Sequence, residues 1–300
     1  MQIALIFLNV ITPVFALVLI GYVAGPRLGL EARTLSRYAY FLLVPSFIFN
    51  VISTAEIELA TATRMILYSL VVHLGCAGLA FLIGWALNRP PKMIAAYVLI
   101  GVFGNVGNFG LPIIEFHLGP EAIVAATIYF LAILIIAFVI GVAVASWAGD
   151  GHSGAILAIF KTPALVVLLP AFLFNWAQIT PPLFLSRITT LLGGAMVPTM
   201  LVALGVQLAS ERALTINRDT VTASAVRLIG GPILALTLVI PFGLTGIERG
   251  TGIFQASMPT AVLASIIAIE HDLLPEFVTT TVLFSTLIST ITLTILLAIV

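Results

Sequence analysis

Ten long apolar runs, separated by short charged or turn-forming breaks, dominate the sequence. A lipid-spanning helix needs about 20 predominantly apolar residues to cross the hydrocarbon core. Only 8% of the residues are charged, whereas a soluble domain has about a quarter. We therefore expect an all-α polytopic membrane protein with ten transmembrane helices. The expected spans are residues 2–24, 36–54, 64–87, 93–116, 121–148, 155–177, 184–209, 219–243, 249–270 and 276–299.

Composition and the absence of familiar catalytic motifs exclude several classes of function. Lys and Arg together number 12, as do Asp and Glu, so the formal net charge is zero. A neutral chain lacks the positive field that attracts nucleic acid, so no nucleic-acid partner is expected. Cys76 is the only cysteine, which leaves no CxxC metal or redox motif. HExxH and GxSxG motifs are also missing from the sequence, so we expect neither an enzyme nor a bound metal or cofactor.

The distribution of Lys and Arg predicts the orientation of the chain. Breaks after odd-numbered spans hold eight basic residues and breaks after even-numbered spans hold three. The eight are Arg27, Arg33, Arg37, Arg89, Lys92, Lys161, Arg212 and Arg218, and the three are Arg64, Arg187 and Arg249. Because cytoplasmic loops are enriched in basic residues, the odd breaks are expected in the cytoplasm. Both termini would then lie on the outer, periplasmic side of the cell inner (plasma) membrane.

The prolines indicate an internal repeat of five spans. They lie in spans 1, 2 and 4 of the first half and in spans 6, 7 and 9 of the second half: Pro13, Pro45, Pro112, Pro163, Pro198 and Pro259. The first and last prolines are 99 residues apart in the first half and 96 in the second. Because five is odd, the halves 1–150 and 151–300 would insert with opposite topology. Inverted repeats with paired interrupted helices are typical of secondary transporters, whose site lies near the membrane midplane.

The fourth span contains a stretch that an ordinary lipid-spanning helix does not tolerate, Gly104-Asn105-Val106-Gly107-Asn108-Phe109-Gly110-Leu111-Pro112. Glycine loosens a helix and proline removes a hydrogen-bond donor. Interrupted backbone at membrane depth is tolerated where it is buried in protein or lines a cavity. Asn105, Gly107, Asn108 and Pro112 are therefore candidate substrate-binding residues. The alternative is that the two amides bind neighbouring helices to one another.

The ninth span has a counterpart, Phe254-Gln255-Ala256-Ser257-Met258-Pro259-Thr260. Pro259 would interrupt the helix, and Gln255 and Ser257 would line the gap. If the two interruptions cross, half-helix N-termini converge, each with about +0.5 charge and unpaired N–H groups. Such a site favours an anion without a basic side chain, and spans 4 and 9 contain no deep Lys or Arg.

Four other intramembrane residues are candidates for gating or coupling. Arg227 lies eight residues past Asp219, about 12 Å into span 8, and is either functional or extends to the headgroups. His73 is either a proton relay or a hydrogen-bonded packing residue. Asn50 and Gln207 follow the prolines of spans 2 and 7. Deep acidic residues are missing from the spans, which gives little support to proton coupling through a buried carboxylate.

Motifs at both interruptions and elsewhere carry a family resemblance. They are 104–112 with Gly119-Pro120-Glu121-Ala122, Ala256-Ser257-Met258-Pro259-Thr260-Ala261-Val262, Leu43-Val44-Pro45-Ser46-Phe47-Ile48-Phe49, Lys161-Thr162-Pro163-Ala164-Leu165, and 197–208. On these strings the chain resembles the auxin efflux carrier family, which includes plant PIN-type carriers and many bacterial members. The long cytoplasmic loop of the plant carriers is absent between spans 5 and 6, which indicates a bacterial-type member.

The resemblance implies two inverted five-helix repeats with crossed broken helices 4 and 9, similar to bile acid symporters and sodium–proton antiporters. It implies a scaffold bundle of spans 1, 2, 6 and 7 and a transport bundle of spans 3–5 and 8–10. By that likeness Asn105, Asn108, Pro112, Gln255 and Pro259 are site positions. The expected function is elevator-type secondary transport of a small organic anion, an auxin-like carboxylate or a dicarboxylate.

Two alternatives stay open: a sodium-coupled organic anion symporter of the bile acid type, and a channel. Besides the organic anion and the lipid bilayer, the expected partners are a proton or sodium as coupling ion and a second copy of the chain in a homodimer.

Overall fold

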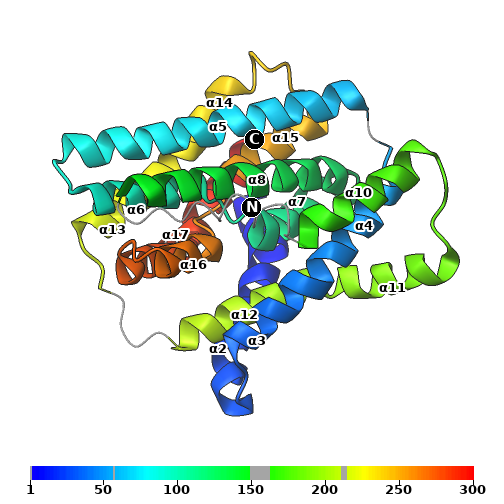
Figure 1. Cartoon of the computed structure of the whole chain (residues 1–300), viewed down its shortest axis with the longest axis horizontal. Coiled ribbons are helices and arrows are strands. Elements are labelled where there is room, and N and C mark those ends of the chain that lie inside the picture. The colour runs from blue at the N-terminus through cyan, green and yellow to red at the C-terminus, as the bar shows by residue number, and fades with distance from the viewer. Residues whose placement is uncertain (1, 57, 149–162, 211–214) are drawn as a thin grey trace. The chain divides into compact units, whose positions relative to one another are not determined.

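The computed structural model describes residues 2–56, 58–148, 163–210 and 215–300, and these are helical apart from their connections and one isolated backbone bridge (Figure 1). The chain forms two compact units. The first comprises Met1–Ile11, Leu59–Ile156 and Ala213–Val300, and the second comprises Thr12–Glu58 and Leu157–Arg212. The expected basic residues Lys161 and Arg212 and the start of the sixth expected span lie outside the described residues.

Three helices of the first unit, α5, α6 and α8, lie side by side (Figure 1). The helices of this unit are α1 (Gln2–Ile6), α5 (Leu59–Ala86), α6 (Pro91–Val102), α7 (Leu111–Leu118), α8 (Ile123–Ala148), α13 (Arg218–Ala225), α14 (Gly231–Leu238), α15 (Gly246–Ala256), α16 (Val262–Glu270) and α17 (Pro275–Ile299). A short 3₁₀ turn, Pro120–Ala122, precedes α8. Helix α15 packs on α5 and α8, and large aromatic side chains such as Phe103, Phe109 and Phe254 are fully buried in this unit.

The second unit is built around two close helix pairs, α2 with α12 and α4 with α10. Its helices are α2 (Thr12–Leu28), α3 (Ala32–Tyr38), α4 (Val44–Thr54), α10 (Pro163–Trp176), α11 (Leu183–Gly194) and α12 (Met196–Ser210). A Cβ atom on Gly21 would overlap the Val202 carbonyl, and one on Gly205 would overlap the Val18 carbonyl. Glycine at both positions therefore lets the α2 and α12 backbones approach closely, as small residues do in membrane helix pairs.

Seven helices in the described residues are long and apolar enough to cross a membrane. They are Ala4–Leu28, Ala32–Thr54, Leu59–Ala86, Pro120–Gly141, Leu183–Ser210, Arg218–Leu238 and Pro275–Ile299. The number of such helices is below ten because the expected spans 93–116 and 249–270 are each interrupted, and because α10 has only 14 described residues. The ten-span count therefore stays a prediction.

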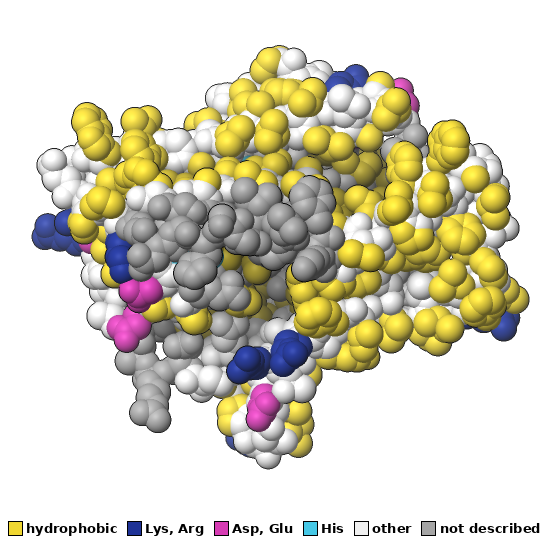
Figure 2. Space-filling view, viewed as in Figure 1, with side chains coloured by type: hydrophobic (Ala, Val, Ile, Leu, Met, Phe, Trp, Pro, Cys, Tyr) yellow, Lys and Arg dark blue, Asp and Glu magenta, His cyan; other side chains and the backbone are white. Residues whose placement is uncertain are grey.

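Many apolar side chains are exposed, as expected for helices that face lipid. Leu19 is 60% exposed, Leu82 58% and Trp176 76%. On the face shown in Figure 2, hydrophobic side chains predominate and the few charged ones lie mainly toward its edges. An apolar exposed surface of this extent is far larger than a soluble monomer carries.

Wide π-helical turns recur directly before prolines in the described residues. The turns are Phe7–Ile11, Ala39–Leu43, Val106–Gly110 and Val226–Gly230, and the prolines, two residues after each turn, are Pro13, Pro45, Pro112 and Pro232. Proline has no N–H and its ring clashes with the carbonyl four residues earlier, so the preceding turn widens. The last two turns lie at the candidate site.

Candidate functional site

The two interrupted segments of the first unit pair through their backbones. Helix α6 ends at Val102, and α15 ends at Ala256. Beyond these ends the Asn105 N–H donates to the Pro259 carbonyl at 2.7 Å, and the Ala261 N–H donates to the Phe103 carbonyl at 2.7 Å. Together they form an antiparallel bridge between Gly104 and Thr260. We call residues 101–105 and 255–261, which include the last residues of α6 and α15, the crossover. The pairing satisfies backbone groups that the broken helices leave free, which buried non-helical backbone requires.

Arg227 binds the carbonyl ends of both broken helices. Its Nε donates to the Met258 carbonyl at 2.8 Å, one Nη to the Ala256 carbonyl at 2.9 Å, and the other Nη to the Gly101 carbonyl at 3.2 Å. The C-terminal end of a helix carries about −0.5 charge, so a cation here stabilises both α6 and α15. The side chain is 0% exposed, which excludes extension to the headgroups.

Arg227 also corrects one expectation from the sequence. The crossover was expected to need no basic side chain, because spans 4 and 9 contain no deep Lys or Arg. That expectation is wrong, since the guanidinium enters from the turn Val226–Gly230, which belongs to neither interrupted segment. The wide turn beside Pro232 places Arg227 in the interior of the unit.

His73 is a hydrogen-bonded residue of the interior. Its Nδ1 lies 2.7 Å from the Val102 carbonyl and its Nε2 lies 3.1 Å from the Tyr129 hydroxyl. A carbonyl only accepts, so Nδ1 carries a proton, and in the neutral ring Nε2 then accepts from the Tyr129 hydroxyl. Val102 is the last residue of α6, so His73 and Arg227 satisfy adjacent carbonyls at one helix end. These contacts favour the packing role over the proton relay.

Two buried amide atoms at the crossover have no hydrogen-bond partner among the described residues. They are the Asn105 Nδ2, a donor, and the Gln255 Oε1, an acceptor. The Gln255 Nε2 donates to the Ala126 carbonyl at 3.1 Å, which fixes the amide against α8. Because buried polar atoms are nearly always paired, a polar ligand is a natural partner for both.

The other candidate residues of the interruptions have different surroundings. Asn108 is partly exposed, and a Cβ atom on Gly107 would lie 3.0 Å from the Phe130 ring. Ser257 is satisfied internally, because its hydroxyl donates to the Ile253 carbonyl at 2.7 Å. Pro112 is buried in the first turn of α7.

Asn50 and Gln207 belong to the second unit, and the crossover belongs to the first. The Asn50 Oδ1 accepts a hydrogen bond from the Thr190 hydroxyl at 3.0 Å, and Gln207 is partly exposed on α12.

Tyr129 and Gly104 contribute to the candidate site, but the sequence did not identify either of them as a site residue. Tyr129 is one tyrosine in a long apolar span, and no local pattern marks it. A Cβ atom on Gly104 would overlap Nη2 of Arg227 and lie 3.0 Å from its Cζ. It would also lie 3.3 Å from Cε1 of His73. Gly104 is therefore the position that leaves room for the guanidinium.

Comparison with known proteins identifies the family. A family model described as a membrane transport protein matches residues 6–297. The chain belongs to this family, the auxin efflux carriers. This auxin efflux carrier family member is therefore a multi-pass membrane transporter.

Its similar relatives come from archaea, bacteria and plants. An uncharacterized transporter of Methanothermobacter thermautotrophicus is 27% identical over 93% of this chain and 94% of its own length. A Rhizobium meliloti protein named "Putative malonate transporter" is 26% identical over 95% of this chain and 93% of its own length. Auxin efflux carrier component 1 of Arabidopsis thaliana is 27% identical over 39% of this chain and 19% of its own length.

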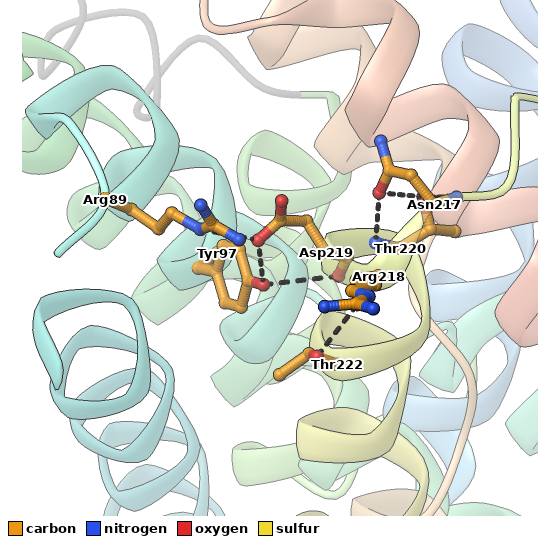
Figure 3. Close-up of polar contacts among 7 residues, drawn as sticks. All are labelled: Arg89, Tyr97, Asn217, Arg218, Asp219, Thr220 and Thr222. Atoms are coloured by element: carbon orange, nitrogen blue, oxygen red, sulfur yellow. Dashed lines mark hydrogen bonds and ion pairs between the residues drawn. The ribbon is translucent and has the colours of Figure 1, made fainter. Parts of the chain in front are cut away.

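A second polar cluster of this transporter lies at the N-terminus of α13 (Figure 3). The Asp219 carboxylate accepts from Arg89 Nε at 2.9 Å and from the Tyr97 hydroxyl at 2.7 Å. The carboxylate is favoured at a helix N-terminus, and the contacts connect α13 to α6 and to the loop after α5. Because each of these groups is paired, we assign the cluster to structure.

A surface hollow of about 630 Å³ lies at the ends of α4 and α10 in the second unit. Its lining includes Glu56, Glu58, Asn175 and Gln178. Two carboxylates would repel an anionic ligand, so this hollow is a poor candidate for an organic anion.

Proposed function

We propose that this transporter is a secondary carrier of a small organic anion, a mono- or dicarboxylate. The observation that carries the proposal is the buried positive charge of Arg227 at the crossover, which no carboxylate of the described residues balances. Within the described residues the ion pairs are Arg89 with Asp219 and Lys92 with Asp272, and no carboxylate pairs with Arg227. A fixed buried cation without a carboxylate raises the local potential and favours an anion.

The unpaired amide of Asn105 and the partly exposed Asn108 support the same proposal. Asn105 Nδ2 is a free donor suited to a carboxylate oxygen. Asn108 lies in the turn Val106–Gly110, where the chain resumes its helix, and the first N–H groups of a helix have no partner within that helix. The name of the Rhizobium meliloti relative adds a specific probe, malonate.

For the mechanism, we propose ten spans in inverted repeats 1–150 and 151–300 and elevator-type alternating access in the inner (plasma) membrane. Spans 1, 2, 6 and 7 would form the scaffold bundle, and spans 3–5 and 8–10 the transport bundle that holds the crossover. The division of the chain into two compact units supports this assignment. Apolar exposed faces of the second unit support a homodimer through the scaffold.

The experiment is uptake of radiolabelled malonate, with other mono- and dicarboxylates as competitors, into liposomes that contain the purified protein. We expect saturable uptake and exchange of internal for external malonate, whereas a channel gives flux that does not saturate. Asn108→Leu should abolish uptake while the protein stays folded, because the substrate loses a hydrogen-bond partner. Asn9→Leu, at an exposed apolar surface, is the matched control and should transport normally.

Normal uptake by Asn108→Leu would contradict the site. Failure of every carboxylate tested to be transported or to compete would contradict the substrate class.

A further inference from the structure

Three backbone carbonyls at the crossover form the kind of oxygen cluster that binds a coupling cation. In transporters with discontinuous helices, unwound carbonyls and helix C-terminal ends coordinate sodium. Here the corresponding carbonyls are those of Gly101, Ala256 and Met258, near the ends of α6 and α15. All three accept hydrogen bonds from one guanidinium, that of Arg227.

Most of the hydrogen-bond donors of Arg227 bind this carbonyl cluster. A guanidinium has five N–H donors. Three of them go to the carbonyls, and Nη1 also lies 3.9 Å from the Cys76 sulfur. The side chain is fully buried and no carboxylate of the described residues is paired with it. The carbonyl dipoles are therefore the main compensation for its charge.

Glycines on two sides leave room for the guanidinium and its acceptors. Gly104 has no space for a Cβ atom beside Arg227, and a Cβ on Gly231 would lie 2.7 Å from the Ala256 carbonyl oxygen. The guanidinium is part of the chain, so unlike a bound ion it does not leave the site during transport.

We propose that Arg227 is a tethered cation in the place of a coupling cation, so that organic anion transport by this protein does not require sodium. The transport part of this inference rests on the proposed function. Removing the side chain should leave three carbonyl oxygens around a vacant space, and a small cation should then bind there. Loss of Arg227 would thus create a sodium dependence that the natural protein lacks.

The first experiment measures thermal unfolding of purified protein in sodium chloride or in choline chloride at equal concentration. The natural protein should have the same Tm in both salts. Arg227→Ala should have a lower Tm in choline chloride and regain part of it in sodium chloride, because a ligand that binds the folded state stabilises it. Arg227→Lys keeps a tethered charge and should be insensitive to the choice of salt.

Arg89→Ala is the matched control, since it removes another arginine that forms an ion pair in the same unit. Its Tm should fall without a specific response to sodium. A sodium-induced rise in the Tm of the natural protein, or no sodium response in folded Arg227→Ala, would overturn the inference. If Arg227→Ala does not fold, a sodium response of Arg227→Lys or of the natural protein overturns it, and insensitivity of both supports it.

The second experiment measures malonate uptake into liposomes in the same two salts. The natural protein should transport equally in both, and Arg227→Ala should be nearly inactive in choline chloride and several-fold faster in sodium chloride. Saturable uptake by the natural protein that requires sodium would overturn this inference and leave the proposed function intact. The predicted melting behaviour without transport of any carboxylate would overturn the proposed function and leave the cation replacement intact.

Discussion

Gly104 has no side chain, and this leaves room for the buried guanidinium of Arg227 at the crossover. The Cα of this residue faces Arg227 and His73, and a Cβ atom would lie 3.0 Å from the Arg227 Cζ. Gly104→Ala must therefore displace a guanidinium held by three carbonyls. We expect a loss of about 1–3 kcal/mol of stability and a clear loss of malonate uptake, measured as Tm in detergent and as initial rate in liposomes.

Gly78→Ala is the control for this substitution, because no heavy atom lies within 4 Å of the Cβ position there. Gly78 is inside α5, where alanine is preferred over glycine by about 0.5–1 kcal/mol. The Tm of this variant should stay equal or rise. A Tm of Gly104→Ala equal to that of the natural protein would contradict the packing argument.

The residues of the site were only partly predictable from the sequence. Asn105 and Gln255 were predicted from their position beside Gly and Pro in apolar segments. In the structure each has one buried side-chain atom without a hydrogen-bond partner among the described residues. The surroundings of Arg227 and His73 could not be predicted. Their partners include backbone carbonyls of Gly101, Val102 and Met258, and a carbonyl has no side-chain signature in a sequence.

At the scale of helices, α13 begins with a capping box formed by Asn217 and Thr220 (Figure 3). The Asn217 Oδ1 accepts from the Thr220 N–H at 2.8 Å, and the Thr220 hydroxyl faces the Asn217 N–H at 3.4 Å. Asn217→Ala removes this cap and should lower stability by about 0.5–2 kcal/mol. The measurement is the Tm of the purified variant.

The Thr222→Ala variant tests whether the effect is specific to the cap. The Thr222 hydroxyl donates to the Arg218 carbonyl inside the helix and Thr222 is partly exposed, so its loss should lower stability by less than loss of the cap does. Equal Tm values for the two variants would contradict a dominant role for the cap.

Interruptions were more predictable than helix lengths. Glycine and proline mark the places where α6 and α15 end, because both residues act through local backbone chemistry. The wide turn before Pro232 was not predicted, although proline is again its cause. It matters because it contains Arg227, and a regular helical pattern would have placed that side chain on a different face.

For the whole molecule, apolar composition predicted the membrane class and the motifs predicted the family, and both are confirmed. The arrangement of units was beyond composition, because each unit is assembled from segments far apart in the chain. Hydropathy records which segments prefer lipid, and it contains no information about which of them pack together.

The sidedness of the termini tests the span count and the charge distribution together. Ten spans with eight basic residues in the odd breaks and three in the even breaks place both termini outside. Alkaline phosphatase fused after Val300 should be active, because it folds outside the cytoplasm, and green fluorescent protein at the same place should be dark. The control fusion, after a truncation at Lys92, should fluoresce.

If only the seven continuous helices crossed the membrane, an odd number of spans would separate the two termini. With the N-terminus outside, the C-terminal fluorescent fusion would then be bright, and both the ten-span fold and the crossing of the interrupted segments within the membrane would be wrong.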